Sequence, residues 1–340
     1  MRAAILTTLN APLTIADLTP PAPQCGQVEV HIHTTTICGA QLGEIEGRKG
    51  PDKYLPHLLG HEASGHVTAI GPGVSQIRVG DTVVLHWRPS LGIQAAGALY
   101  RWNDRIVNAG PVTTFQEIAI VSENRCTVIP PDTDLETAAL YGCAITTAFG
   151  VISNEARVRP GESVVVLGSG GVGLCEIMAA KLCSALPIVA LDCLPERLVT
   201  AKQFGATHTI NTRFADWQTQ LKNILPHGAD AVIENTGVQS LIEASCTLTH
   251  PRGRTILVGV PRAGETAAIS TLPLHFDRTV RGSCGGGTIP HEDIPRYMRL
   301  AASGAFDPRT LITHRFPLED INTALDLMRA GKSVRCAIHM

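Results

Sequence analysis

A glycine-rich turn constrains the fold of this chain more than any other segment. The residues Gly168-Ser169-Gly170-Gly171-Val172-Gly173 follow the apolar run Ser163 to Leu167 and open a stretch with a helical pattern. Gly168 permits a tight turn, Gly170 lets backbone N–H groups approach a pyrophosphate, and Gly173 lets the helix pack closely on its strand. Strand, turn and helix in this order predict a dinucleotide-binding site in a doubly wound parallel sheet of the Rossmann type.

Two charged residues after the next apolar run bear on which dinucleotide is bound. Asp192 follows Ile188 to Leu191, where a carboxylate can accept hydrogen bonds from both ribose hydroxyls and would repel a 2′-phosphate. Arg197, a short distance further on, is a cation that would attract such a phosphate. We therefore expect NAD as the coenzyme and NADP as the less favoured one.

The bulk properties exclude several classes of function. A chain of 340 residues predicts two domains, and 28 Lys and Arg against 30 Asp and Glu argue against nucleic acid or an anionic membrane as a partner. No apolar run reaches the roughly 20 residues that span a bilayer, and Met1 to Ile5 lead into polar residues, so a cytoplasmic location is expected. The ten cysteines include no C-x-x-C pair and most are interpreted as apolar filler.

The secondary-structure pattern changes near the middle of the chain. Up to about Pro131, short β-like runs broken by Gly and Pro indicate a β-rich domain; they include Val28 to His33, His66 to Ile70, Thr82 to Leu85 and Glu117 to Val121. From about Thr146, apolar runs alternate with segments of helical length: Val164 to Leu167, Ile188 to Leu191, Thr207 to Ile210, Ala231 to Ile233 and Thr255 to Val258. Two helices, Asp293 to Ala302 and Leu318 to Ala330, and a strand, Val334 to His339, are expected to end the chain.

Four residues of the first half have the chemistry of a metal site. They are Cys38, the pair His61 and Glu62, and Cys143. Two thiolates and an imidazole are ligands that zinc prefers, and three protein ligands leave a fourth position for a substrate oxygen. Spacing alone leaves open the alternative that the cysteines are small buried side chains and that the histidine is merely hydrogen-bonded.

Nearly end to end, the chain resembles the zinc-dependent medium-chain alcohol dehydrogenases. The resemblance is carried by Ile37-Cys38-Gly39, Gly60-His61-Glu62 with Gly65, Gly71-Pro72-Gly73-Val74, Val79-Gly80-Asp81-Thr82-Val83, Gly142-Cys143 with Thr146-Thr147, the glycine turn, Gly237, Gly259-Val260-Pro261 and Gly331-Lys332-Ser333-Val334-Arg335. It implies an α/β chain with a GroES-like β-rich catalytic domain over residues 1–145, completed by 287–340. A Rossmann NAD-binding domain over 146–286 is inserted between the two parts.

The resemblance also implies roles for individual residues. Cys38, His61 and Cys143 would bind the catalytic zinc, with Glu62 behind them or as an occasional fourth ligand. Thr147 would lie against the nicotinamide and Arg335 near the pyrophosphate. Trp87 and Phe115 would be apolar walls of the substrate pocket, with the alternative that both are ordinary core aromatics.

Two departures from the family pattern change the expectations. Many relatives hold a second, structural zinc with four closely spaced cysteines, but this chain has no cysteine between Cys38 and Cys126. One zinc per chain is therefore expected, with packing and hydrogen bonds holding the stretch from His86 to Gly110.

The second departure concerns proton release. Where alcohol-oxidising relatives carry a hydroxyl and a histidine, this chain has Ala40 and Gly43. Where relatives carry an acidic residue that orients the zinc-bound histidine, this chain has Gln41. Hydride transfer stays possible because zinc lowers the pKa of a bound alcohol. We hypothesise that the proton leaves through His86, or through Glu62 with bound water.

These observations predict a zinc-dependent oxidoreductase that transfers a hydride between NAD(H) and a small alcohol or carbonyl substrate. A first alternative is a zinc-site reductase that works mainly on carbonyls, imines or conjugated alkenes, for which a missing hydroxyl at Ala40 matters less. A second alternative is a non-catalytic NAD-binding protein that kept the fold. By resemblance, the chain is expected to form a homodimer or homotetramer, partly through the strand near Thr255 to Val260.

Overall fold

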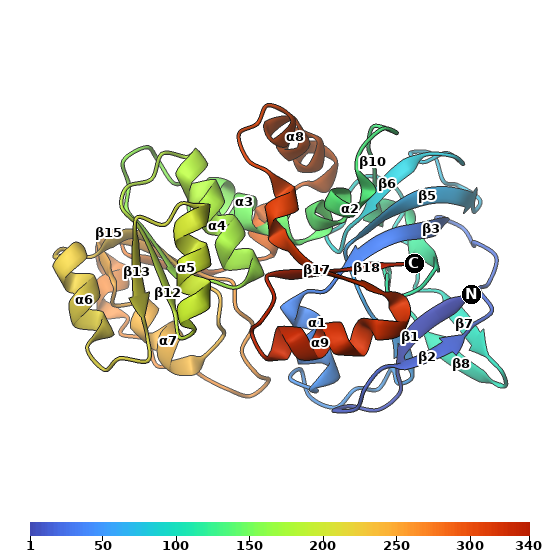
Figure 1. Cartoon of the computed structure of the whole chain (residues 1–340), viewed down its shortest axis with the longest axis horizontal. Helices are drawn as coiled ribbons and strands as arrows, with labels where there is room; N and C mark the ends of the chain where they lie inside the picture. The colour runs from blue at the N-terminus through green and yellow to red at the C-terminus, as the bar shows by residue number, and fades with distance from the viewer. The chain divides into compact units, whose positions relative to one another are not determined.

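The computed structural model describes all residues from 1 to 340. The chain divides into two compact units (Figure 1). The first contains Met1–Thr146 and Ile289–Met340, and the second contains Thr147–Thr288. The first unit is therefore built from both ends of the chain.

The second unit is a six-stranded parallel sheet flanked by helices (Figure 1). Its strand order is β13-β12-β11-β14-β15-β16, with the bounds His208–Asn211, Ile188–Asp192, Val164–Leu167, Ala229–Glu234, Thr249–Leu257 and Thr279–Gly282. The helices are α4 (Gly171–Leu182), α5 (Pro195–Phe204), α6 (Trp217–Ile224) and α7 (Gln239–Ser245). The chain starts at the centre of this sheet and builds one side and then the other, so the strand order reverses between β11 and β14, where sheets of this kind bind their ligands at the carboxyl ends of the strands. The predicted doubly wound parallel sheet is confirmed.

Continuous apolar runs make these strands because both faces of the sheet are covered. All four residues of β11 and all five of β12 are buried, Asp192 at the end of β12 included. A parallel sheet buried on both sides shows no polar alternation, which is why the runs are readable in the sequence. Leu167, Leu191 and Val232 belong to one core cluster with Leu221 of α6.

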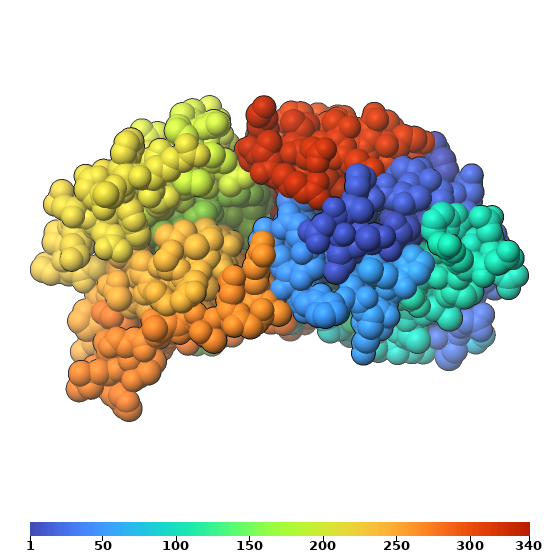
Figure 2. All heavy atoms as spheres, turned by 90° about the horizontal axis from the view of Figure 1, so that it is seen from below, coloured from blue at the N-terminus to red at the C-terminus, as the bar shows by residue number.

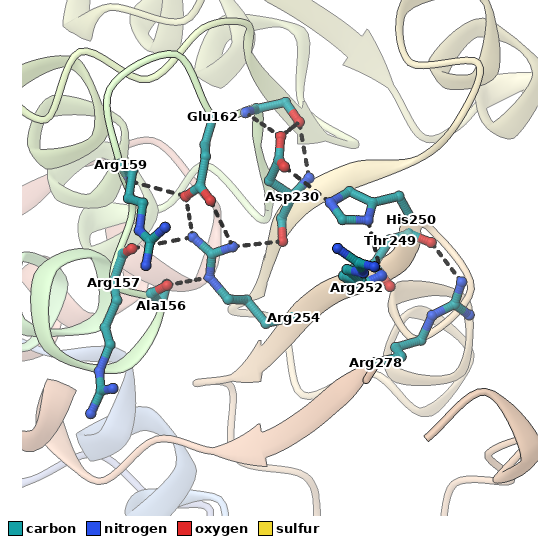
Figure 3. A network of polar contacts seen from close by, with 11 residues as sticks. Ala156, Arg157, Arg159, Glu162, Asp230, Thr249, His250, Arg252, Arg254 and Arg278 are labelled. Carbon is teal, nitrogen blue, oxygen red and sulfur yellow. Dashed lines mark hydrogen bonds and ion pairs between the residues drawn. The ribbon is translucent and has the colours of Figure 1, made fainter. Parts of the chain in front are cut away.

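An ionic network closes the amino-terminal edge of this sheet (Figure 3). The Arg254 guanidinium pairs with Glu162 and donates to the backbone carbonyls of Ala156 and, at 3.2 Å, Asp230. The Asp230 carboxylate in turn accepts from the Ser163 backbone at 2.8 Å. Ser163 directly precedes β11 and Asp230 lies near the start of β14, so the network holds together the ends of these strands that lie opposite the glycine turn.

The first unit holds two mixed sheets. One has the order β10-β6-β5-β3-β18-β17, with β9 also on β3; the bounds are Cys126–Val128, Thr82–Leu85, Ala63–Ile70, Gln27–Thr36, Arg335–His339, Ile312–Pro317 and Ile118–Ser122. The other has the order β2-β1-β4-β8-β7, with the bounds Thr14–Asp17, Arg2–Leu6, His57–Leu58, Arg105–Asn108 and Leu99–Trp102. The helices are α1 (Gly39–Ile45), α2 (Leu135–Ala138), α8 (Pro290–Ala302) and α9 (Ile321–Arg329), and α3 (Ala144–Gly150) leads into the second unit.

The last strand of the chain completes the first sheet. β18 pairs antiparallel with β3, with Ala337 opposite Thr36 and His339 opposite Thr34. The end of β3 leads directly to Cys38, and β18 begins with Arg335. Sheet pairing therefore brings an arginine from the end of the sequence beside a cysteine near its start.

The structure adds strands that the pattern did not predict. The β7–β8 hairpin lies in the cysteine-free stretch from His86 to Gly110, and two of its large apolar side chains, Leu99 and Ile106, are exposed. Strand β16 is short and largely exposed at the edge of the parallel sheet. At most one side chain of each of these strands is buried, Tyr100 in β7 and Val107 in β8, so apolar periodicity does not reveal them.

No single helix is long and apolar enough to cross a membrane. One bent pair, Leu135–Gly142 with Ala144–Glu155, passes the same test on length and composition.

Candidate metal and dinucleotide sites

Cys38, His61 and Cys143 converge on one point of the first unit. Cys38 lies between β3 and the start of α1, His61 follows β4, and Cys143 directly precedes α3. The two sulfur atoms and the nearest imidazole nitrogen all lie within 4.8 Å of one another. Both cysteines are buried and His61 is half-buried. Two soft ligands and one imidazole at this spacing can hold a zinc ion.

The electrostatics of the three residues favour a thiolate. A hydrogen bond with Cys143 lowers the pKa of the Cys38 thiol well below its usual range and, against burial, the nearby Arg335 adds to the lowering. Burial acts to lower the pKa of His61, but its interaction with Cys38 outweighs burial and the net pKa is raised. A site that stabilises negative charge on sulfur is suited to a cation, because thiolates are the form that binds metals.

One ring nitrogen of His61 tests whether these residues fit a metal ion. His61 Nε2 is buried and has no hydrogen-bond partner. An unpaired buried nitrogen costs free energy comparable to a lost hydrogen bond, so such atoms are rare. In the tautomer that carries the ring proton on Nδ1, a metal ion held with the two sulfurs would satisfy Nε2, and in that form the residues fit zinc.

Gln41 lies behind His61 and touches two of the three ligands. Its Oε1 accepts a hydrogen bond from the Cys38 backbone N–H at 2.8 Å, and its Nε2 lies 2.7 Å from His61 Nδ1. In this orientation the amide donates to Nδ1, which leaves the ring proton on Nε2. Metal binding through Nε2 needs the other tautomer, with Nδ1–H donating to an acceptor. The amide is thus a poorer partner for a metal-bound imidazole than a carboxylate would be.

Glu62 is buried and fully engaged. Its Oε1 accepts from Arg335 Nη1 at 3.0 Å, and its Oε2 accepts from the Ala144 backbone N–H at 3.1 Å. Arg335 also donates to the Ile37 carbonyl at 3.0 Å. Burial raises the pKa of Glu62, and Arg335 partly opposes the rise. The pair ties together the segments that carry Cys38, His61 and Cys143.

The glycine turn has the geometry that the motif requires. Gly168 has a φ of +89°, and a Cβ on Gly173 would lie 2.0 Å from the Gly168 carbonyl oxygen. At Gly170, a Cβ would meet only Arg197 Nη1, at 4.0 Å, and α4 begins there with no side chain capping its backbone N–H groups. An uncapped helix start beside open space fits a phosphate, so the residues present fit a dinucleotide.

Asp192 joins the glycine turn to the next loop. One carboxylate oxygen accepts from the Ser169 backbone N–H at 2.8 Å, and the other accepts from the Leu194 backbone N–H at 2.9 Å. Arg197 Nη1 lies 3.6 Å from the first of these oxygens. The acid and the arginine that bear on coenzyme choice are therefore neighbours.

The remaining predicted residues are placed as follows. Thr147 is buried in α3 of the second unit. Phe115 is fully buried in a core cluster with Ile37 and Leu59, the environment of an ordinary core aromatic. Trp87 is half-buried, and its ring lies 5.9 Å from the Arg88 guanidinium carbon.

His86 has structural partners on both ring nitrogens. Nδ1 lies 2.7 Å from the Arg88 carbonyl oxygen and Nε2 lies 2.9 Å from Thr127 Oγ1. Burial lowers its pKa to about 4. Both nitrogens are therefore occupied without any substrate.

Glu123, which no sequence motif marks, organises the stretch before the hairpin. The Glu123 carboxylate accepts three backbone hydrogen bonds, from Ser75 at 2.6 Å, Gln76 at 2.8 Å and Ile93 at 2.7 Å. The only signal for it is an acidic residue placed directly after an apolar run. Such a residue is common at exposed strand ends, so the pattern does not distinguish this one.

Comparison with known proteins gives consistent matches. Residues 24–131 match the family model of the alcohol dehydrogenase GroES-like domain, and residues 171–303 match that of the zinc-binding dehydrogenases. The S-(hydroxymethyl)glutathione dehydrogenases of Synechocystis sp. and Photobacterium damsela are 30% and 31% identical to the chain, each over 99% of both proteins.

Solved structures agree. An alcohol dehydrogenase zinc-binding domain protein from Burkholderia ambifaria has a TM-score of 0.91 at 28% identity, over 100% of this chain and 98% of that one. Benzyl alcohol dehydrogenase from Acinetobacter calcoaceticus has a TM-score of 0.90 at 29% identity, over 100% and 99%. The predicted combination of a GroES-like part and a Rossmann part is confirmed.

Proposed function

Because the chain belongs to the zinc-dependent medium-chain alcohol dehydrogenase family and is an oxidoreductase of that kind, we propose that Cys38, His61 and Cys143 hold its catalytic zinc. The convergence of these three ligand atoms within 4.8 Å, with His61 Nε2 unpartnered, is the observation that carries the proposal. When bound, zinc would act as a Lewis acid toward the oxygen of an alcohol or carbonyl substrate. The small-molecule alcohol substrates of the family agree with this chemistry.

The chain's own residues orient and hold this site. Gln41 fixes the His61 ring from behind, while Glu62 and Arg335 hold the backbone segments that carry the ligands. This arrangement keeps three ligands in place on separate elements, as orientation of the reacting groups requires. Arg335 contributes in this way whether or not it also approaches the pyrophosphate.

We also propose a direct route for the substrate proton. Both carboxylate oxygens of Glu62 and both ring nitrogens of His86 already have partners, so neither side chain offers an idle atom for a relay. Ala40 is exposed, and water at its position would take the proton without a side-chain relay. A His86→Ala variant with a normal pH–rate profile would support this route.

The coenzyme is proposed to be NAD rather than NADP. Support comes from Asp192, which is buried at the end of β12 and would face a 2′-phosphate as a like charge. Arg197 is directed to Asp192 at 3.6 Å rather than left for a phosphate. The glycine turn and the first turn of α4 would hold the pyrophosphate.

One zinc per chain is proposed, with no structural zinc. The stretch before the hairpin has its own supports: Glu123 binds three backbone N–H groups, and Ser122 Oγ accepts from the Ala95 backbone N–H at 2.8 Å. Arg125 adds a bond to the Trp87 carbonyl. These contacts would replace the metal of relatives as the organiser of this stretch.

A homodimer or homotetramer is proposed, joined through the second unit. Strand β16 leaves the edge of the parallel sheet unpaired, and the segment before it exposes Val260, Leu272 and Phe276, each about two-thirds exposed. Figure 2 shows part of this orange segment projecting from the surface of the second unit.

A cytoplasmic location stays a prediction.

The activity is tested with purified protein and zinc. A panel of primary, secondary, benzylic and polyol alcohols is offered with NAD, and the matching aldehydes and ketones with NADH. S-(hydroxymethyl)glutathione is included because relatives are named for it. Turnover in both directions supports the proposal. Turnover only with NADH would favour the reductase alternative, and NADH binding with no turnover would favour a non-catalytic protein.

A further inference from the structure

A buried acid in the dinucleotide helix has no role in the chemistry described above. Glu176 lies on α4, shortly after Gly173, and is 0% exposed. Its Oε2 accepts a hydrogen bond from Asn235 Nδ2 at 2.6 Å. A carboxyl group in a helix interior is costly unless it is paired or neutral.

The surroundings of Glu176 contain too many acceptors for an ionised group. Glu176 Oε1, Asn235 Oδ1 and Glu155 Oε2 are all buried and have no hydrogen-bond partner. All three are acceptors when the carboxyls are ionised, so none can serve another. A protonated Glu176 supplies the donor that this group lacks.

The charges around Glu176 act in the same direction. Burial raises its pKa to about 8; Asn235 opposes the rise, and the acids Glu234 on β14 and Glu155 on the π-helical segment η3 (Val151–Glu155) add to it. Glu155 is itself 3.6 Å from Arg281, and Glu234 is held by the backbone N–H groups of Thr236 and Gly237. The packed elements also carry other charged side chains, which are not among the causes of the raised pKa: Lys181 on α4, Asp192 on β12, and Glu196, Arg197 and Lys202 on α5.

Asn235 connects this acid to the dinucleotide turn. Its backbone N–H donates to the Leu167 carbonyl at 2.9 Å, directly before Gly168. A Cβ on Gly168 would lie 3.5 Å from the Asn235 Cβ and 3.0 Å from Thr236. The loop after β14 therefore packs on the turn that the sequence identifies as the pyrophosphate site, and Glu176 holds that loop from below.

We propose that Glu176 is a positioning residue for the dinucleotide: as a neutral acid it fixes Asn235 against the glycine turn, and loss of its proton to solvent weakens NAD(H) binding. The inference rests on the proposed dinucleotide site. An ionised Glu176 would face two other acids in a buried setting, and the least costly relief is movement of α4 or of the Asn235 loop. Either movement disturbs the preorganised N–H groups that bind phosphate. By linkage, NADH binding near pH 8 must then take up protons.

The test compares NADH binding by calorimetry in wild type, Glu176→Gln and Glu176→Leu over about pH 6 to pH 9.5. Glutamine keeps a neutral hydrogen-bonding group, so Glu176→Gln should match wild type within about twofold near pH 6. From about pH 7 upward the wild-type Kd should rise at least about fivefold more than that of Glu176→Gln, because one pKa unit corresponds to tenfold. Glu176→Leu cannot form a hydrogen bond with Asn235, so it should bind NADH more weakly than Glu176→Gln does, by the same factor at every pH.

Controls separate this inference from the proposed function. Glu243→Gln changes an acid on α7 that lies at the surface, and its Kd should follow wild type throughout. Parallel Kd curves for wild type and Glu176→Gln would overturn the inference. If neither the wild type nor any variant bound NADH, the proposed function would fail instead.

In that case the thermal unfolding midpoints of Glu176→Gln and wild type still test whether Glu176 is protonated. A difference between the two midpoints that is the same at pH 5 and pH 8 would overturn the protonated state, and a difference that widens with pH would support it.

Discussion

Glu62 and Arg335 are separated by 273 residues in the sequence and form an ion pair of 3.0 Å. Both side chains are almost completely buried, at 0% and 2% exposure. The pair joins the final strand of the chain to the residue next to His61, and Arg335 also binds the carbonyl of Ile37 beside Cys38. The metal-ligand segments are therefore assembled by a contact between the two ends of the chain.

Removal of one partner should be more damaging than removal of both. Arg335→Met leaves a buried carboxylate without its cation and should lower the free energy of unfolding by about 3–5 kcal/mol. Adding Glu62→Met in the same chain removes the stranded charge, so the double variant should be more stable than Arg335→Met alone. Urea unfolding of the zinc-free protein measures both. Strictly additive losses would show that the pair is not coupled in this way.

The stability of the protein should depend on pH through Glu176. Its pKa is about 8 in the folded chain against an ordinary value of 4.5, so the folded chain keeps a proton that the unfolded chain releases between these values. The stability contribution of Glu176 is then lost as pH rises from about 4.5 to about 8, by up to about 1.4 kcal/mol per pH unit. Glu176→Gln does not titrate and should gain on wild type over this interval, then stay level. Chemical unfolding at several pH values checks the slope, and an unchanging difference would contradict it.

Features set by local sequence were predictable here, and those set by distant contacts were not. The glycine turn, β11, β12 and the order of apolar runs follow from patterns within a few residues, and the Rossmann sheet was predicted from them. The partners of Arg335 and Glu176 come from segments far away in the sequence, so neither the buried ion pair nor the acid cluster could be predicted from spacing. Resemblance assigned Arg335 to the pyrophosphate, whereas its observed hydrogen bonds go to Glu62 and Ile37.

The candidate site shows the same division. Cys38, His61 and Cys143 were singled out because their chemistry is uncommon, and the structure brings them together. The partners of His86 were not foreseeable, since Thr127 and the Arg88 carbonyl carry no signal in the sequence. That Cys38, His61 and Cys143 bind a metal stays a prediction.

Gln41→Glu should strengthen zinc binding. A carboxylate can accept both the Cys38 backbone N–H and the Nδ1–H of a metal-bound His61, whereas the amide of Gln41 offers one acceptor for the two. We expect zinc affinity to rise about 10- to 100-fold, the usual size of such an effect. Competition with a chromophoric chelator measures it. Gln41→Met is the matched control without a polar partner for Nδ1 and should bind zinc more weakly than Gln41→Glu; equal affinity in all three proteins would show that this partner is irrelevant.

Asp192→Ala should shift coenzyme preference toward NADP. The change removes the carboxylate that would repel a 2′-phosphate and frees Arg197, which lies 3.6 Å from it, to bind that phosphate. We expect the ratio of kcat/KM for NADP to that for NAD to rise at least about tenfold, a conservative value for removing a like charge at close range. In the Asp192→Ala background, Arg197→Ala should cancel most of the gain. An unchanged ratio would place the coenzyme's ribose elsewhere.

The most direct test of the central claim is the zinc content of the purified, zinc-replete chain, measured beside its Cys143→Ala variant. The account predicts about one zinc per wild-type chain, loss of that zinc and of turnover in the variant, and retention of NADH binding by both, because the dinucleotide residues lie on other segments. Wild-type protein without zinc, or a variant that keeps both its zinc and its activity, would contradict the assignment of Cys38, His61 and Cys143 as the catalytic metal site.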